Sequence, residues 1–77
     1  MKHARKDYND LAALDKRIPK DEPVFLIRGQ DLLAPYVLRY YADEAKRAGV
    51  DPRISRSVRA QAKRMEAWRK HKLPDLP

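Results

Sequence analysis

The chain has 77 residues, no cysteine and a formal net charge of +7. This length indicates one small domain, which buries only about 60% of the surface that its unfolded form exposes and is marginally stable as a monomer. The lack of cysteine excludes disulfides and thiolate metal sites, and the positive charge favours anionic partners over an acidic mimic of DNA. We therefore expect a homo-oligomer that binds an anionic partner.

The N-terminal part of the sequence is charged and then weakly amphipathic. Leu11, Leu14 and Ile18 follow a helical spacing, which predicts a short N-terminal helix, although an irregular segment fits the same residues. No apolar run follows the basic start, so we expect no signal peptide, no membrane span and a cytoplasmic location. The expected organisation is a mobile basic arm over residues 1–7, a single domain over 8–72 and a tail over 73–77.

The only continuous apolar run in the sequence, residues 24–27, predicts a short strand or extended segment over residues 23–28. A single strand needs a partner, so we expect it to pair with the N-terminal segment or with a second copy of the chain, or else to pack on the helices as an extended segment. A polar turn over residues 28–31 ends the run and leads into a helix. Such junctions place side chains beside free backbone N–H groups, where anionic ligands are often held.

Two longer helices are predicted over residues 31–48 and 52–70, separated by a very tight turn. Gly49 is suited to the left-handed position after a helix, while Asp51 and Pro52 are suited to the start of the next one. These signals predict a helical hairpin. The expected fold is therefore mainly α, with the hairpin preceded by the short strand.

Each predicted helix of the hairpin carries an apolar stripe, and Asp31 is the expected N-cap of the first. We expect the two stripes to pack against each other or against another subunit. On the first helix the stripe comprises Leu33, Val37, Tyr40 or Tyr41, Ala45 and Ala48, and on the second it comprises Ile54, Val58, Gln61, Met65 and Trp68.

Groups that perform catalysis are scarce in this sequence. His3 and His71 lie near opposite ends of the chain, so neither a histidine relay nor a metal site has a credible spacing. Two glycines in the whole chain do not supply a glycine-rich phosphate loop. We expect a binding protein with no catalytic residues, no metal and no cofactor.

Side chains suited to a nucleotide-type ligand gather around the polar turn and the start of the next helix. Arginine guanidinium groups hold phosphates through paired hydrogen bonds, and tyrosine rings stack on bases. Glutamine and aspartate can read a base edge, or can simply cap the turn. The predicted ligand site comprises Arg28, Gln30, Asp31, Tyr36 and Arg39.

A second basic region lies on the last helix, where residues 53–72 contain Glu66 as their single acid. A basic helix face binds the phosphate backbone of nucleic acids with an affinity that falls steeply with salt, although it can also be only a well-solvated surface. The alternative prediction is a nucleic-acid-binding protein. Its expected contact residues are Arg56, Arg59, Lys63 and Lys70.

The segment from 18 to 31 reads Ile-Pro-Lys-Asp-Glu-Pro-Val-Phe-Leu-Ile-Arg-Gly-Gln-Asp. Together with Ala34-Pro35, Tyr41-Ala42, Gln61-Ala62 and the Met-Glu-Ala-Trp sequence over 65–68, it resembles a family of small uncharacterised bacteriophage and prophage proteins. The resemblance covers roughly residues 18–68, with no known activity attached to it.

In size, basic charge and expected hairpin, but not in any aligned motif, the chain is similar to phage anti-defence sponges, which are oligomers that sequester nucleotide second messengers. This analogy implies a protein that sequesters an anionic nucleotide-derived signal in the host cytoplasm and so counters host immunity. Direct inhibition of a host defence complex through a protein–protein contact is a further alternative.

Overall fold

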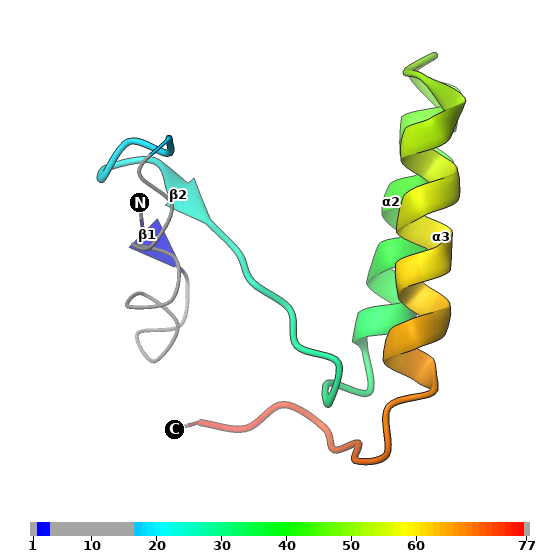
Figure 1. Cartoon of the computed structure of the whole chain (residues 1–77). Coiled ribbons are helices and arrows are strands. Elements are labelled where there is room, and N and C mark those ends of the chain that lie inside the picture. The colour runs from blue at the N-terminus through cyan, green and yellow to red at the C-terminus, as the bar shows by residue number, and fades with distance from the viewer. Residues whose placement is uncertain (1, 4–16, 77) are drawn as a thin grey trace.

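The computed structural model describes residues 2–3 and 17–76. Its main feature is a hairpin of two helices, α2 (Ala34–Arg47) and α3 (Pro52–Glu66), and two short strands, β1 (Lys2–His3) and β2 (Pro23–Val24), lie apart from it (Figure 1). The predicted hairpin with a short strand before it is therefore confirmed. The predicted N-terminal helix rests on Leu11 and Leu14, which lie outside the described residues.

The turn between the helices follows the sequence signals closely. Gly49 has a φ of +79°, and its N–H donates to the carbonyl of Lys46 at 3.1 Å while the N–H of Val50 donates to the carbonyl of Ala45 at 3.2 Å. This pattern is the Schellman motif, which satisfies carbonyls that the end of a helix leaves without partners. Asp51 then caps α3 by accepting a hydrogen bond from the N–H of Arg53 at 3.0 Å.

The two helices contact each other through small side chains. Ala42 and Ala62 are fully buried, and Ser55 is buried with its hydroxyl donating to the carbonyl of Pro52 at 3.1 Å. Small residues at the contact allow the helix axes to approach closely. Among the described residues, no large side chain is fully buried.

The predicted apolar stripes therefore pack only in part. On α3 Val58 and Met65 are half-buried, whereas Ile54 and Gln61 are exposed, as is Trp68 just beyond the helix. The exposed large side chains of α2 and its approach are Leu32, Leu33, Tyr36, Val37, Tyr40 and Tyr41. Within one chain the contact is centred on the alanines and Ser55, so the large apolar side chains lie beside it and not in it. Packing of the stripes against another subunit, the other predicted alternative, stays a prediction.

Both helices are shorter than predicted. Asp31 is not the N-cap of α2, because its carboxylate accepts a hydrogen bond from the N–H of Leu33 at 2.8 Å in a turn that precedes the helix. At the other end α3 stops at Glu66, where the ring of His71 donates through Nε2 to the carbonyl of Met65 at 2.9 Å. The same carbonyl also accepts from the N–H of Trp68 at 3.1 Å, so a side chain and a backbone group both partner this terminal carbonyl.

The strand pairing uses the N-terminal segment, which was one of the predicted alternatives. β1 and β2 pair in parallel, with Lys2 opposite Pro23 and His3 opposite Val24. The expected strand or extended segment over 23–28 contains β2 at its first two residues, and residues 25–28 continue without regular secondary structure. Residues 25–30, which we call the strap, instead run from β2 to the base of the hairpin (Figure 1).

The chain after α3 returns beneath the hairpin and holds the end of the strap. The N–H of Lys72 donates to the carbonyl of Gln30 at 2.8 Å, and the N–H of Leu32 donates to the carbonyl of Lys72 at 3.0 Å. These two bonds fix the strap against the base of the hairpin. Neither helix in the described part of the chain has the length and apolar character that a membrane span requires.

Candidate functional site

An apolar groove lies between the strap and the hairpin. It has a volume of about 680 Å³ and receives side chains from the strap and from both helices. Val37 and Tyr41, which line it, are 45% and 58% exposed. The full lining of this apolar groove is Ile27, Val37, Leu38, Tyr41, Ser57, Val58, Gln61 and Arg64.

A second, polar pocket adjoins the groove near the base of the hairpin. It has a volume of about 380 Å³, and it shares Gln61 and Arg64 with the apolar groove. The strap contributes one wall and α3 with its C-terminal extension contributes the other. This polar pocket is lined by Arg28, Gly29, Gln30, Gln61, Arg64, Met65 and Trp68.

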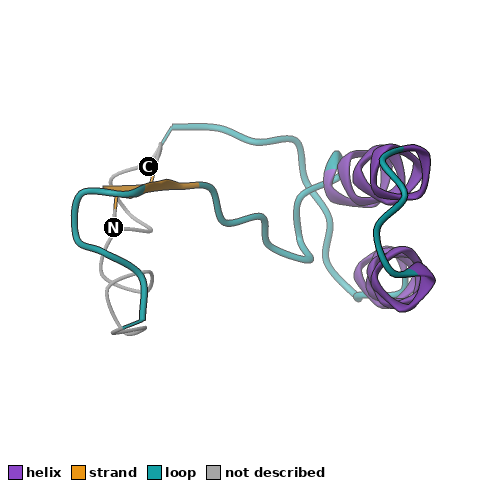
Figure 2. Ribbon diagram, turned by 90° about the horizontal axis from the view of Figure 1, so that it is seen from above, coloured by secondary structure: helices purple, strands orange, loops and turns teal. Residues whose placement is uncertain are grey.

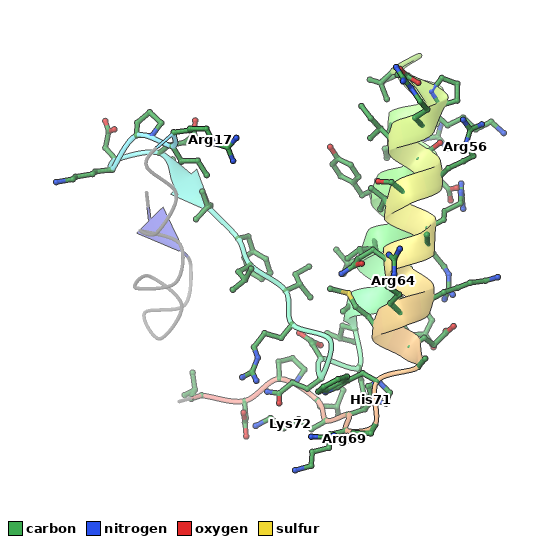
Figure 3. The ribbon with its side chains drawn as sticks, in the orientation of Figure 1. Arg17, Arg56, Arg64, Arg69, His71 and Lys72 are labelled. Atoms are coloured by element: carbon green, nitrogen blue, oxygen red, sulfur yellow. The ribbon has the colours of Figure 1, made fainter. Side chains whose placement is uncertain are left out.

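Two arginines bring positive charge to the polar pocket from opposite walls. Arg28 comes from the strap, and Arg64 comes from α3, where Figure 3 labels it. Nη1 of Arg64 donates to Oε1 of Gln61 at 2.8 Å, which orients its guanidinium group. Within residues 2–3 and 17–76, no carboxylate forms an ion pair with either arginine. The described carboxylates therefore do not neutralise their charge.

Trp68 supplies an aromatic wall of the polar pocket. Its side chain is 49% exposed, and the Arg69 guanidinium carbon lies 5.1 Å from the centre of the indole ring. The strap approaches it through Gly29, where a Cβ added by substitution would lie 3.7 Å from the Cβ and Cγ atoms of Trp68. Arg69, His71 and Lys72 lie beneath the hairpin near this end of α3 (Figure 3).

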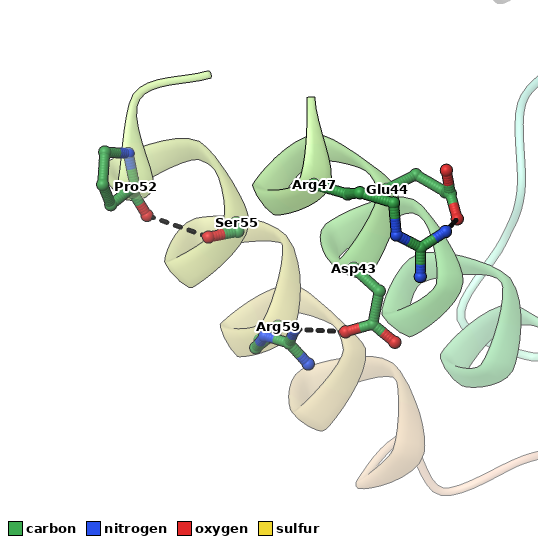
Figure 4. A network of polar contacts seen from close by, with 6 residues as sticks. All are labelled: Asp43, Glu44, Arg47, Pro52, Ser55 and Arg59. Carbon is green, nitrogen blue, oxygen red and sulfur yellow. Dashed lines mark hydrogen bonds and ion pairs between the residues drawn. The ribbon is translucent and has the colours of Figure 1, made fainter. Parts of the chain in front are cut away.

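The hairpin carries a contrasting ion-pair face, which we define by Arg39, Asp43, Arg59 and Glu66. Arg39 reaches across to α3 with Nη1 and Nη2 at 3.0 Å and 2.9 Å from the two carboxylate oxygens of Glu66. Arg59 reaches back from α3 to Asp43 (Figure 4). These two pairs join the helices through side chains that the apolar groove does not use.

The ion pair between Arg39 and Glu66 changes the ionisation of both groups. The hydrogen bonds from Arg39, followed by its charge, lower the pKa of Glu66 below its ordinary value, and the hydrogen bonds to Glu66 raise the pKa of Arg39. At the start of α3, hydrogen bonds from Arg53 likewise lower the pKa of Asp51. All of these groups lie at the surface, so their contribution is screened by solvent.

The structure brings together only part of the predicted ligand site. Arg28 and Gln30 line the polar pocket, whereas Arg39 is bound to Glu66 on the ion-pair face. Tyr36 is 70% exposed, and Asp31 lines a separate pocket of about 150 Å³ beside Pro74 of the tail. Of the five residues, two meet at the pocket.

Besides Gly29 of the strap, four pocket residues were not among the predicted ligand residues: Gln61, Arg64, Met65 and Trp68. They recur on α3 and its extension at spacings of three and four, which places them on one side of a helix. That spacing was the available signal, but it is equally typical of a packing stripe. Only the position of the strap distinguishes a packing stripe from a pocket wall.

The alternative basic face of the last helix is divided in the structure. Arg59 is paired with Asp43, while Arg56 and Lys63 have no ion pair with a carboxylate in the described part of the chain. Lys70 lies beyond the end of α3. At the tip of the hairpin Arg56 and Arg59 line a pocket of about 550 Å³ with Lys46.

Comparisons with known proteins found no family model, no curated protein and no solved structure that matches this chain. The resemblance to bacteriophage proteins and the analogy with nucleotide sponges therefore stay predictions.

Proposed function

We propose that this chain is a non-enzymatic binding protein that sequesters an anionic, nucleotide-type small molecule in the polar pocket. The observation that carries the proposal is the meeting of Arg28 and Arg64 from opposite walls, with no carboxylate to neutralise either of them within the described residues. Every nearby acid of the ion-pair face already has its own arginine.

Phosphate is the anion that these two side chains suit best. An arginine presents N–H groups in a planar fork that matches two phosphate oxygens, and hydrogen bonds between charged groups are about twice as strong as neutral ones. Two forks that line one pocket suit a ligand with more than one phosphate oxygen exposed, such as a phosphodiester or a diphosphate.

The remaining groups of the polar pocket suit the base of a nucleotide. Trp68 offers an aromatic surface for stacking, and the amides of Gln30 and Gln61 can donate to and accept from a base edge. The volume of about 380 Å³ falls in the range of small-molecule sites. An anion without a ring contacts only the arginines and is expected to bind more weakly than a nucleotide.

Trp68 is the only tryptophan of the chain and lines the pocket, so its fluorescence reports binding directly. We would titrate the full chain with cyclic dinucleotides, cyclic trinucleotides, ADP-ribose and inorganic phosphate, and follow thermal unfolding in parallel. A ligand at a hundredfold its dissociation constant adds about 2.7 kcal/mol to the free energy of unfolding. The expected result is a change in Trp68 emission together with a rise in melting temperature for one ring-bearing phosphate.

Two variants and a matched control locate the site. Arg28→Ala and Arg64→Ala should each weaken binding about tenfold or more, because each removes charge-assisted hydrogen bonds. Arg56→Ala removes an equal charge at the far tip of the hairpin and should bind normally. If none of the probes binds, or if all three variants lose affinity equally, the proposed pocket is wrong.

Nucleic acid is the second candidate, favoured by the cations at the tip of the hairpin that no described carboxylate pairs with, Lys46 and Arg56. Binding to short duplex DNA should then weaken steeply between low and high salt, because each phosphate contact releases counterions. In that case Arg56→Ala, and not Arg28→Ala, should reduce affinity.

A further inference from the structure

The polar pocket presents hydrogen-bond donors far more than acceptors. Arg28 and Arg64 carry only N–H donors, and the indole nitrogen of Trp68 is likewise a donor without acceptor capacity. None of its lining residues within the described chain is an aspartate or a glutamate. The amide oxygens of Gln30 and Gln61 are therefore the strong acceptors that side chains bring to this pocket.

One of these two amide oxygens is already engaged. Nη1 of Arg64 donates to Oε1 of Gln61 at 2.8 Å. Because arginine cannot accept a hydrogen bond, the oxygen of the Gln61 amide must face it, and the two N–H groups of the amide point away from Arg64. A ligand in the pocket therefore meets Gln61 as a donor, beside the donors of both arginines.

The main-chain carbonyls that border the pocket are engaged as well. The strap and the chain after α3 lie as loops between the hairpin and the paired strands (Figure 2), and main-chain carbonyls commonly accept hydrogen bonds from ligands. Here the carbonyl of Arg28 accepts from the N–H of Asp31 at 3.0 Å, and the carbonyl of Gln30 accepts from the N–H of Lys72 at 2.8 Å. The carbonyl of Met65 has the two partners described above. The segments around the pocket thus add few acceptors to it.

We propose that this excess of donors makes the polar pocket selective for guanine nucleotides over adenine nucleotides. The inference rests on the proposed function, because it identifies the base of the nucleotide that the arginines hold by its phosphates. The Hoogsteen edge of guanine presents two adjacent acceptors, O6 and N7, whereas that of adenine presents the acceptor N7 beside the N6 amino donor. The Gln61 amide can donate to both guanine atoms, but at adenine it faces another donor, and a donor left without a partner under a ligand costs free energy.

Hydrogen bonds carry this selectivity because the other contacts of the pocket are the same for every nucleotide. Trp68 can stack on any base, since every base has an aromatic face, and the arginines bind phosphates that all nucleotides share. Of the two amides, that of Gln61 is oriented by its bond to Arg64, whereas no hydrogen bond within the described chain fixes the side chain of Gln30. Gln61 is therefore the residue that determines the choice of base, and Gln30 supplies a matched control.

Isothermal titration calorimetry of the full chain with GDP and ADP tests the proposal, because the two ligands share the same ribose and diphosphate and differ only in the base. GDP should bind about tenfold or more tightly than ADP, which is the discrimination expected of one good two-atom contact to a base edge. Inosine diphosphate keeps O6 and N7 and should bind like GDP. The 7-deaza analogue of GDP lacks the N7 acceptor and should bind more weakly than GDP.

Two glutamine variants locate the selectivity, with the ratio of the GDP and ADP affinities as the readout. Gln61→Met removes the amide from an exposed side chain of similar length, so the variant should fold and the two affinities should become nearly equal. Any loss of orientation at Arg64 weakens both nucleotides alike and leaves their ratio unchanged. Gln30→Met should keep the preference for GDP.

The outcomes separate this inference from the proposed function. Equal affinity for GDP and ADP in the unaltered chain, or a preference for GDP that survives Gln61→Met, would overturn the selectivity while nucleotide binding itself stands. If neither diphosphate binds, the selectivity is also wrong. The proposed function is then wrong as well only if the cyclic dinucleotides and the other probes of the earlier titration fail to bind.

Discussion

The helical hairpin and the strap that lies beside it are stabilised in different ways. Each end of the hairpin turn has its own cap, and two ion pairs join α2 to α3. The strap is held at its base by two backbone hydrogen bonds with Lys72 and at its far end by a two-residue strand pairing. The backbone ends and the acids of the hairpin contact are satisfied locally, whereas the strap side has exposed apolar surface and, at the polar pocket, two arginines with no ion pair to a described carboxylate.

This difference assigns separate roles to the two regions. Local capping and ion pairs make the hairpin a rigid support, because they satisfy its backbone and its charges without any partner. The strap side has groups whose partners are missing from the described chain: apolar side chains and the guanidinium groups of Arg28 and Arg64. Binding is therefore expected on the strap side, and loss of stability is expected from changes in the hairpin.

The largest effect on stability should come from enlarging a buried alanine between the helices. Ala62→Leu adds bulk where the side chain has no exposed surface, so the helices must separate, at a cost of about 1–3 kcal/mol. Ala60→Leu is the matched control, because Ala60 is exposed on the same helix and should change the free energy of unfolding little. Urea denaturation of the two variants measures the difference, and equal values would show that the alanine contact does not set stability.

Substitution of the two glycines should distinguish the hairpin from the strap, with a smaller change in the free energy of unfolding than Ala62→Leu causes. Gly49→Ala should cost about 1–2 kcal/mol, because the turn requires a positive φ that disfavours any Cβ. Gly29→Ala in the strap should change stability little, since its φ is not positive and the nearest atoms to a new Cβ lie at 3.7 Å, an ordinary contact. A large loss from Gly29→Ala would mean that the strap is held as tightly as the hairpin.

The hairpin could be predicted from the sequence because its determinants are local. Gly49, Asp51 and Pro52 act on the backbone within one turn, and their positions fix where one helix stops and the next begins. The residues of the contact within one chain were not singled out, because the large apolar residues were expected to pack there or against another subunit, whereas Ala42 and Ala62 are the buried ones. The side of an amphipathic helix that faces its neighbour depends on how closely the two helix axes approach. Small residues set that distance only when the two helices are packed together, so one helix sequence by itself does not reveal it.

The candidate site was harder to predict because it is formed by segments distant in sequence. Arg28 and Gln30 were identified from the polar turn, but Arg64 and Trp68 join them only through the path of the strap across α3. That path depends on backbone bonds between Lys72 and the strap's end, and backbone bonds leave no side-chain pattern in the sequence. The pairing of Arg39 with Glu66 could not be predicted for a similar reason, since Glu66 lies on the other helix.

Loosening the strap without touching the hairpin tests the role of the tail. Lys72→Pro removes the N–H that donates to the carbonyl of Gln30 at 2.8 Å, and loss of one such bond costs about 0.5–1.5 kcal/mol. Helix content measured by circular dichroism should stay unchanged, while Trp68 emission should shift as the polar pocket opens. Lys70→Pro lies outside the helix and makes neither of the two bonds, so it is the control. Equal effects of both variants would show that the tail does not hold the strap at the polar pocket.

The smallest effect on stability should come from the exposed ion pair between the helices, and it should depend on pH. The pKa of Glu66 in the folded chain lies below its ordinary value of 4.5 because Arg39 donates hydrogen bonds to its carboxylate. Its contribution is therefore fully present above pH 4.5 and is lost as the pH falls through the lower pKa of the folded state. Glu66→Gln should lower the free energy of unfolding at pH 7 and leave it nearly unchanged at the most acidic pH.

The pH dependence should flatten in Glu66→Gln without disappearing, because the pKa of Asp51 is also lowered, by hydrogen bonds from Arg53, and contributes a loss of the same sign. Arg39→Ala should flatten the profile in the same way as Glu66→Gln, since either change removes the pair. Urea denaturation at low salt measures both profiles, because salt screens an exposed pair. An acid profile identical to that of the unaltered chain would show that this ion pair adds nothing to the hairpin, which would then depend on its alanine contact and its caps alone.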